Sequence, residues 1–415
     1  MAFKWYLGVD WGSEMHAWCL VDAAGHVLVE RLVTHEAAAV AAALAQLRTQ
    51  AAAAIDDIAV GIEVGHGVLV DALLEQGLAV FAINPKQLDR FRDRFTAGGA
   101  KDDRRDARAI ADALRTDARA FRAIHSDDPA VLPLRELSRM LEELQIEQAR
   151  LVNRLREQLY RVDAPWLRLS PSANDPWLWT VLRDTPHPDA WSRLSRRRIA
   201  AALRDHRIRR VTPDAVIETL QQPRLHAAAG VSDAVALRLA ALIPQLLLVH
   251  QQFRTAEHQI DRVLADLATP DSAGQPGEHR DAEILQSLPG VGRVVAATML
   301  TEACGPLADR DYPTLRALVG VAPVTKRSGK RRWLVHMRYA CKSRLREAVY
   351  HWARTSIQHD AIARTYYRQL RVRGHNHARA LRSVGDRWLR ILVAMLQNRT
   401  LYDPAKLIHA SVALP

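Results

Sequence analysis

The sequence predicts an α/β domain at the N-terminus and a mostly helical remainder. Over the first 120 residues, short apolar runs rich in β-branched residues alternate with helix-favouring segments. Residues 134–159 then form a long stretch without Gly or Pro, which is typical of a helix. At roughly 150 residues per domain, a chain of 415 residues predicts two or three domains. We place them at residues 1–125, 126–280 and 281–405.

The composition indicates a basic globular protein. Lys and Arg number 58 against 46 Asp and Glu, a net charge of +12, which favours a polyanionic partner, nucleic acid before membrane. The three cysteines are too far apart for a zinc cluster or a disulfide framework, so a reducing compartment is expected. No signal peptide and no apolar run near the ~18 residues of a membrane span are seen. We therefore expect a cytoplasmic protein.

The elements of the first domain follow from turn and cap signals. The turn sequence at 22–25 links two short strands into an antiparallel meander, and Thr34 caps an Ala-rich helix. The expected strands are 5–10, 17–21, 26–33, 58–63 and 78–83, and the expected helices are 34–54, 68–77, 86–95 and 102–117. The order β-β-β-α-β-α-β-α is that of the ribonuclease H superfamily. There, strand one lies centrally and the fourth strand pairs beside it.

Four acidic residues fall where this fold would gather them. Asp10 closes the first strand, Glu63 closes the fourth, and Asp103 and Asp106 lie three apart on one helix face. Clustered carboxylates repel unless cations neutralise them, and oxygen-only donors suit Mg²⁺ or Mn²⁺. Two such ions about 4 Å apart stabilise the attacking and leaving oxygens of a phosphoryl transfer. Taken singly, each acid could instead be a turn former or a helix-terminal residue.

A leucine pattern marks the long helix of the middle segment. Leucines between 134 and 159 recur at near-heptad spacing, which predicts an intramolecular hairpin or, slightly preferred, a dimeric coiled coil. A second helical stretch from 234 to 267 is a candidate partner. Pro244 is expected to kink or split it.

Between these helices lies a stretch rich in Trp and Arg. Such a surface can neutralise phosphates and stack on unpaired bases. The alternative is a solvated helix face over a small aromatic core. The residues are Trp166, Trp177, Trp179, Trp191, Arg193, Arg196, Arg197, Arg198, Arg204, Arg207, Arg209 and Arg210.

The third domain begins with a helix over 282–288 and the turn Pro289-Gly290-Val291-Gly292. A second helix opens at Arg293, which is the pattern of a helix-hairpin-helix. Gly290 and Gly292 would let backbone amides reach a nucleic-acid phosphate without reading bases. A glycine-turned hairpin without a ligand is the alternative.

A serine in a cationic loop is the candidate nucleophile. Between Pro323 and Tyr350 there are nine Lys or Arg and one acid, Glu347. Neighbouring cations would stabilise an alkoxide on Ser328 and the phosphorane it forms, although a Ser-Gly pair is often only a loop. Tyr350, Tyr366 and Tyr367 are rivals, which we assign to packing. The loop cations are Lys326, Arg327, Lys330, Arg331 and Arg332.

These motifs together resemble transposases of the insertion sequence 110 family, the DEDD recombinases guided by a bridge RNA. The resemblance covers about residues 5–120 and 283–395. The family usually has Thr where this chain has Asp102, and the spacing assigns the last two acids to Asp103 and Asp106. The motifs are Gly8-Val9-Asp10-Trp11-Gly12-Ser13-Glu14, Gly61-Ile62-Glu63-Val64-Gly65, Ile83-Asn84-Pro85, Lys101-Asp102-Asp103-Arg104-Arg105-Asp106-Ala107, Leu288-Pro289-Gly290-Val291-Gly292, Gly320-Val321-Ala322-Pro323 and Ser328-Gly329.

The resemblance implies a RuvC-like N-terminal domain, a coiled-coil linker and a helical transposase domain. It implies that Ser328 attacks a DNA phosphate to form a covalent phosphoserine intermediate. The acids Asp10, Glu63, Asp103 and Asp106 would hold Mg²⁺ (or Mn²⁺) in a composite site from two subunits.

The implied partners are the double-stranded DNA of the element ends and target, a noncoding bridge RNA, and further copies of the chain in dimers and tetramers. The expected location is the bacterial cytoplasm, at the nucleoid, without a membrane. Two rival hypotheses use the same residues: a structure-selective nuclease of the Holliday-junction type, in which water attacks, and an inactive nucleic-acid-binding scaffold.

Overall fold

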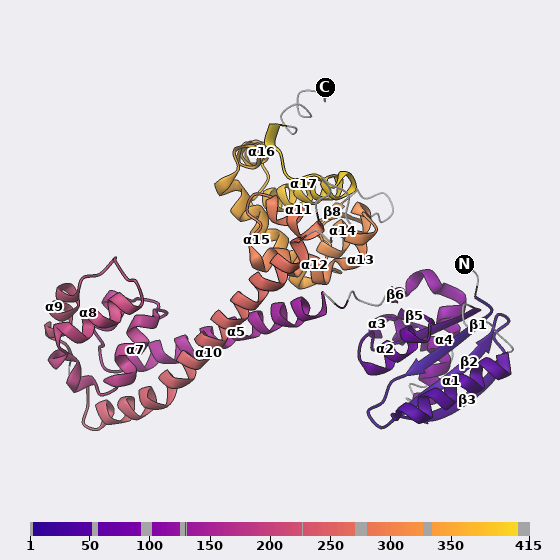
Figure 1. Cartoon of the computed structure of the whole chain (residues 1–415), viewed down its shortest axis with the longest axis horizontal. Coiled ribbons are helices and arrows are strands. Elements are labelled where there is room, and N and C mark those ends of the chain that lie inside the picture. The colour runs from indigo at the N-terminus through magenta and orange to yellow at the C-terminus, as the bar shows by residue number, and fades with distance from the viewer. Residues whose placement is uncertain are drawn as a thin grey trace. The chain divides into compact units, whose positions relative to one another are not determined.

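The computed structural model describes residues 3–51, 57–92, 102–124, 129, 131–225, 227–269, 280–326 and 334–405. The chain forms two compact units, Met1–Asp127 and Asp128–Pro415. Figure 1 shows a mixed α/β first unit and a second unit that is almost entirely helical. This confirms the predicted combination of an α/β region with a helical remainder.

The first unit is built on one six-stranded sheet. The central strand β1 pairs antiparallel with β2 and parallel with β4, as the predicted element order required. The sheet order is β3-β2-β1-β4-β5-β6. The prediction missed β6, which pairs antiparallel with β5 and has three residues, too few for a pattern. The strands are β1 (Trp5–Asp10), β2 (Met15–Asp22), β3 (Val27–Thr34), β4 (Ile58–Ile62), β5 (Ala79–Ala82) and β6 (Arg122–Ile124).

Helices cover both faces of this sheet. Leu7 and Val9 of β1 point into the core beneath α1 (Ala37–Ala51) and α2 (Val68–Glu75). The other face is covered by α3 (Pro85–Arg92) and α4 (Asp103–Asp117), through residues such as Leu88 and Ile110. The period-2 alternation of the strands therefore supplies two apolar layers.

Two glycines let α4 lie unusually close to the sheet. A Cβ on Gly8 would lie 1.9 Å from the carbonyl oxygen of Ala107, and a Cβ on Gly61 would lie 2.7 Å from Ile110 Cγ2. Because backbone atoms of α4 occupy that space, the contact at Gly8 excludes every side chain. The close packing fixes the first turn of α4 beside the ends of β1 and β4.

The second unit contains a long pair of helices, α5 (Leu132–Tyr160) and α10 (Val231–Ala268). They lie side by side and antiparallel in Figure 1, so the intramolecular hairpin is the alternative that the structure adopts. The dimeric coiled coil, which was slightly preferred, stays a prediction. Pro244 lies inside an unbroken α10, so the predicted split does not occur.

One window of α10 is long and apolar enough to cross a membrane, by length and composition alone. The sequence-based expectation that no such run exists was therefore too strict. Val235, Leu239 and Leu246 of this helix pack into one apolar core of the unit, and Ala256 and Ile260 pack into the other. A helix that supplies two buried cores behaves as a core helix.

The Trp- and Arg-rich stretch folds as a small helical module around the far end of this pair. Trp166, Trp177, Trp179 and Trp191 are all at most 1% exposed, so they form its core and do not stack on bases. Trp166 packs edge-on against Trp177 and Trp191, at 6.2 and 6.0 Å between ring centroids. This corrects the stacking hypothesis in favour of the aromatic-core alternative. The module contains α6 (Trp166–Leu169), α7 (Pro176–Asp184), α8 (Arg196–Asp205) and α9 (Pro213–Gln221).

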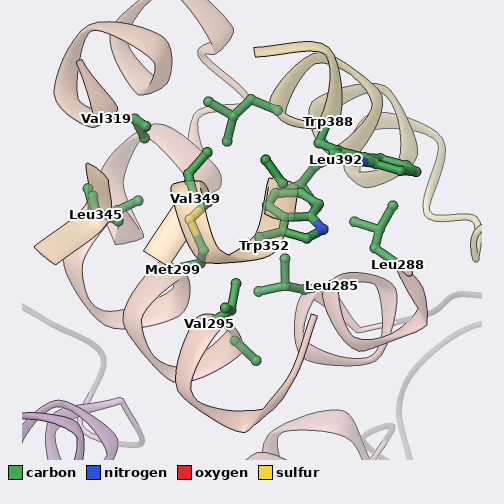
Figure 2. Packing of buried hydrophobic residues seen from close by; sticks show 14 of the residues in the cluster. Leu285, Leu288, Val295, Met299, Val319, Leu345, Val349, Trp352, Trp388 and Leu392 are labelled. Carbon is green, nitrogen blue, oxygen red and sulfur yellow. The ribbon is translucent and has the colours of Figure 1, made fainter. Parts of the chain in front are cut away.

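The C-terminal part of the second unit packs around two tryptophans. Trp352 and Trp388 stack with 5.9 Å between ring centroids, and Leu285, Met299 and Leu392 surround them (Figure 2). The strands β7 and β8 form an antiparallel pair that flanks residues 327–333. The elements are α11 (Asp281–Ser287), α12 (Arg293–Glu302), α13 (Cys304–Ala308), α14 (Tyr312–Val319), β7 (Val324–Lys326), β8 (Leu334–His336), α15 (Ser343–His359), α16 (Ala361–Val372) and α17 (His377–Asn398).

Candidate active site

The acids of β1 and β4 emerge at the same edge of the sheet. The parallel register pairs Val9 with Ile62, so Asp10 and Glu63 are the next positions on neighbouring strands. Both side chains are half-buried. Parallel strands bring their carboxyl ends to one edge, which is the placement that the sequence predicted.

The first turn of α4 supplies two more acids to this edge. Asp106 is 3% exposed, whereas Asp103 is open to solvent. Asp102 precedes the helix and accepts a hydrogen bond from the backbone N–H of Arg104 at 3.3 Å. Asp102 is therefore the N-cap of α4, which gives it a local structural role beside the acids of the site.

An arginine from α3 is bound to the most buried of these acids. Arg92 donates from Nη2 to Asp106 Oδ2 at 2.7 Å, and its Nε lies 2.6 Å from Oδ1. The same guanidinium donates to Asp89 at 2.7 Å. Sequence reasoning missed Arg92 because nothing in the local pattern distinguishes it from Arg90.

The electrostatics of this edge favour a cation. Burial, together with the charges of Asp106, Asp103 and Glu63, raises the pKa of Asp10 to about 6, against an opposing effect of Arg92. A carboxyl whose pKa is raised by neighbouring carboxylates lies in uncompensated negative potential. Three of the predicted acids, Asp106, Asp103 and Glu63, thus act on the fourth, Asp10.

A divalent ion is compatible with this donor set. Within the described ranges, no three His, Cys, Asp or Glu side chains are gathered closely enough to hold a metal ion as they stand. The oxygen-only donors and the raised pKa of Asp10 nevertheless fit Mg²⁺ or Mn²⁺ better than zinc. Asp103 is exposed at the first turn of α4.

The candidate nucleophile lies outside the described residues. Ser328 and the cations Arg327, Lys330, Arg331 and Arg332 fall in residues 327–333, whereas Lys326 ends β7. The rival nucleophiles Tyr350, Tyr366 and Tyr367 pack against the hydrophobic core, in keeping with the role expected for them.

Two of the cations beyond the hairpin have structural partners. Lys342 donates to Glu302 Oε2 at 3.2 Å, and Arg344 donates to Glu302 Oε1 at 3.0 Å and to Glu142 of α5 at 2.6 Å. Burial alone would raise the pKa of Glu302, but Lys342, Arg139 and Arg344 together lower it. These cations therefore anchor α5 to the base of α15.

The glycine turn between α11 and α12 is only partly open. Gly290 has φ +83°, and a Cβ there would lie 2.7 Å from the backbone nitrogen of Ser356 in α15. Trp352 Nε1 donates to the carbonyl of Pro289 at 3.1 Å. Gly292 is exposed, with no atom within 4 Å of a Cβ built on it. The turn thus packs Gly290 against α15 and leaves Gly292 exposed.

The arginines of α8 differ in their pairing. Arg196 makes two hydrogen bonds to Asp214, at 2.5 and 3.0 Å, and Arg198 lies 3.4 Å from Asp184. Arg197 is exposed and has no ion pair within the part of the chain that the structure describes. Of the three predicted phosphate-binding residues, Arg197 is the one whose charge stays unpaired.

A sheet edge with acidic side chains and a strongly basic second unit are compatible with a nucleic-acid-processing protein. Residues 7–162 match a family model described as transposase, and residues 282–368 match one described as transposase IS116/IS110/IS902 family. The mini-circle putative transposase for IS117 of Streptomyces coelicolor is 30% identical over 96% of this chain and 95% of that protein. The chain belongs to the IS110 family of transposases.

Other relatives agree with this assignment. The insertion element IS110 uncharacterized 43.6 kDa protein of Streptomyces coelicolor is 30% identical over 74% of this chain and 73% of that protein. The putative transposase y4uE of Sinorhizobium fredii is 48% identical over 49% of this chain, and the match spans 57% of its own length.

Proposed function

We propose that this transposase is an RNA-guided recombinase that excises and inserts its own mobile element through a serine nucleophile. The observation that carries the proposal is the acidic edge of the first unit, where burial and three neighbouring carboxylates raise the pKa of Asp10. The RuvC-like identity of that unit is supported by the order and pairing of its strands. The substrate is the double-stranded DNA of the element ends and target.

The chemical step proposed for Ser328 is a phosphoryl transfer. Its Oγ forms a bond to phosphorus and loses its proton, while the bond from phosphorus to one bridging deoxyribose oxygen breaks and that oxygen gains a proton. The energy of the phosphodiester is thereby kept in a phosphoserine ester, so rejoining to a new DNA end needs no ATP. Cations of residues 326–332 would stabilise the charge on the phosphorane.

The four acids would hold the divalent ion. When bound, Mg²⁺ supplies Lewis-acid stabilisation of the phosphoryl oxygens. Asp10 and Glu63 present oxygens from the sheet edge, and Asp103 and Asp106 present them from α4. Arg92 must release Asp106 before that carboxylate can serve as a ligand, because the guanidinium occupies both of its oxygens.

The RNA partner and the assembly are also part of this proposal. The chain carries a net charge of +12, which suits a large polyanionic complex. A guide RNA whose loops pair with element and target DNA would supply sequence recognition, so the protein need hold only backbone and shape. Dimers and tetramers would assemble around that RNA at the bacterial nucleoid.

The deciding experiment is adduct formation. The full-length protein, the RNA that copurifies with it and duplexes carrying the element end and target would be incubated with Mg²⁺ and run on a denaturing gel. Wild type should give a covalent protein–DNA band, Ser328→Ala none, and the control Ser343→Ala, which changes an exposed serine of α15, a normal band.

Other outcomes of this experiment would support one of the rival hypotheses or reject the serine assignment. Cleavage without an adduct in the wild type would assign water as the nucleophile and support the structure-selective nuclease. Tight binding without any metal-dependent cleavage would support the scaffold. An adduct that persists in Ser328→Ala would sink the serine assignment.

A further inference from the structure

Among the described residues, four arginines at the base of the β7–β8 pair have no carboxylate partner, unlike Lys342 and Arg344. They come from three places in the second unit: Arg338 follows β8, Arg346 lies on α15, and Arg379 and Arg382 lie on α17. We call them the arginine site.

The position of Arg346 is fixed by the turn that ends α14. Its Nη2 donates to the carbonyl of Arg338 at 2.6 Å and lies 3.3 Å from the carbonyl of Tyr339. Gly320 caps α14 with φ +80°, and a Cβ there would lie 2.9 Å from the same Nη2. The glycine of the motif Gly320-Val321-Ala322-Pro323 is therefore required both by its φ and by the guanidinium packed on it.

Arg382 reaches the same place from α17. Its Nη1 lies 3.3 Å from the sulfur of Met337, the residue that follows β8. The Nε groups of Arg338 and Arg346 are buried and have no hydrogen-bond partner among the described residues. Buried N–H groups without partners are uncommon, and they mark a place where an acceptor fits.

Two neighbouring cations, Arg379 and Arg346, act on the guanidinium of Arg382. Burial lowers the pKa of Arg382, and the positive charges of Arg379 and Arg346 lower it further, while Tyr339 acts in the opposite direction. The sequence has no Asp or Glu from Tyr312 to Arg346, and none between Asp360 and Asp386. Guanidinium groups held together without carboxylates need an anion between them.

We propose that Arg338, Arg346, Arg379 and Arg382 bind a backbone phosphate of duplex DNA beside the hairpin that carries Ser328. The guanidinium fork matches the geometry of a phosphate and binds it through paired N–H···O contacts. The site would hold the strand in register for the serine. The inference rests on the proposed function, because it takes the DNA to be the substrate of that serine.

The test compares two arginine-to-glutamine variants of the full-length protein. Arg382→Gln changes the site. Arg354→Gln removes the same charge from an exposed position of α15 that has no ion pair among the described residues. Binding to a short DNA duplex of random sequence is measured by fluorescence anisotropy in EDTA over a range of salt, with an RNA duplex of the same sequence in parallel.

We expect Arg382→Gln to raise the Kd for DNA about tenfold and to lower the slope of log K against log salt by about 0.9, the value for one phosphate contact. Arg354→Gln should leave both close to wild type. Arg379→Gln, which changes an exposed residue and so spares the fold, should shift both quantities in the same direction as Arg382→Gln.

The arginine site would be overturned if circular dichroism shows folded protein and the DNA affinity and salt slope are the same in Arg379→Gln, Arg382→Gln and Arg354→Gln. The serine mechanism would still be decided by its own adduct test. A loss confined to the RNA duplex would also overturn it and assign the arginines to RNA. Wild-type protein that binds no DNA duplex would also overturn the arginine site, whereas the proposed function is decided separately by the adduct test with the copurified RNA.

Discussion

The two units of this transposase differ in the sign of their net charge and in the surroundings of one glycine each, Gly8 and Gly292. Residues 1–127 carry 14 Lys or Arg and 18 Asp or Glu, a net −4, whereas residues 128–415 carry 44 and 28, a net +16. Opposite charges are thus segregated along the chain. Because most carboxylates of the first unit are not neutralised by arginines of the second, the carboxylates can attract a divalent ion and the arginines can attract phosphate.

The glycines show a second contrast. In the first unit Gly8 is enclosed by the backbone of α4, whereas Gly292 in the second unit faces open space. The first region depends on close packing to bring acids together. The second presents exposed turns and arginines to a partner.

The largest effect should come from filling the tight contact. Gly8→Ala places a Cβ 1.9 Å from the carbonyl oxygen of Ala107, so α4 must move off the sheet. We expect the first unit to lose about 3 kcal/mol or more of unfolding free energy, at the upper end of overpacking costs. Gly292→Ala, with nothing nearby, should change stability by less than about 1 kcal/mol. Chemical denaturation of both variants checks this, and equal midpoints would refute the packing argument.

The next effect concerns the buried carboxylate of the basic unit. Glu302→Gln would leave Lys342, Arg344 and Arg139 around a neutral amide that is only 10% exposed as a side chain. We expect a loss of about 2 kcal/mol, since a partly buried ion network is broken on one side. Glu136→Gln, at 74% side-chain exposure, is the matched control and should cost almost nothing. Thermal unfolding of the second unit would reveal the difference, or its absence.

A third variant tests Arg92, a cation that is bound within the acidic site of the first unit. Arg92→Gln removes the guanidinium that holds both oxygens of Asp106. Mn²⁺ affinity should rise about tenfold, or about 1.4 kcal/mol, because the competing cation is gone. Arg90→Gln, an exposed neighbour on α3, controls for the lost charge. Calorimetric titration with Mn²⁺ gives both affinities, and identical values for the two variants would show that Arg92 does not compete.

The smallest effect is a pH dependence of stability. The pKa of Asp10 is raised to about 6 by burial and by Asp106, Asp103 and Glu63, with Arg92 opposing. The folded state therefore binds a proton that the unfolded state has released between about pH 4 and 6, so stability falls as pH rises through that window. In EDTA, Asp10→Asn should stabilise the first unit at pH above 6 by about 1 kcal/mol, after allowance for solvent screening.

The advantage of Asp10→Asn should vanish below about pH 3, where the wild-type carboxyl is protonated in both states. Unfolding curves at the two pH values test this. A constant difference between variant and wild type across pH would mean that the neighbouring acids do not act on Asp10.

The sequence predicted the acidic edge because strand ends and helix starts are local patterns. Asp10 and Glu63 close apolar runs, and a parallel pairing then places them together without further information. The hydrogen bonds of Arg92 could not be foreseen in this way. They depend on α3 and α4 meeting across a stretch of chain in which Arg90 and Arg92 look alike.

For the Trp- and Arg-rich stretch, by contrast, the sequence alone was misleading. Composition alone suggested base stacking, but four tryptophans close in sequence are also enough to build a core, and the structure buries them. Likewise, Arg196 is paired with Asp214, which is distant in sequence, whereas Arg197 has no ion pair among the described residues. Such long-range contacts have no signature in a local pattern.

The anchoring of α5 has a mechanical consequence. This single helix of 29 residues runs about 43 Å from the base of α15 to the tryptophan core. At its near end, Arg344 is bound to Glu142 and Ser138 of the helix. The helix is therefore a stiff connection. A force applied at its far end by a bound partner would be transmitted to α15, which follows the strand pair on either side of Ser328.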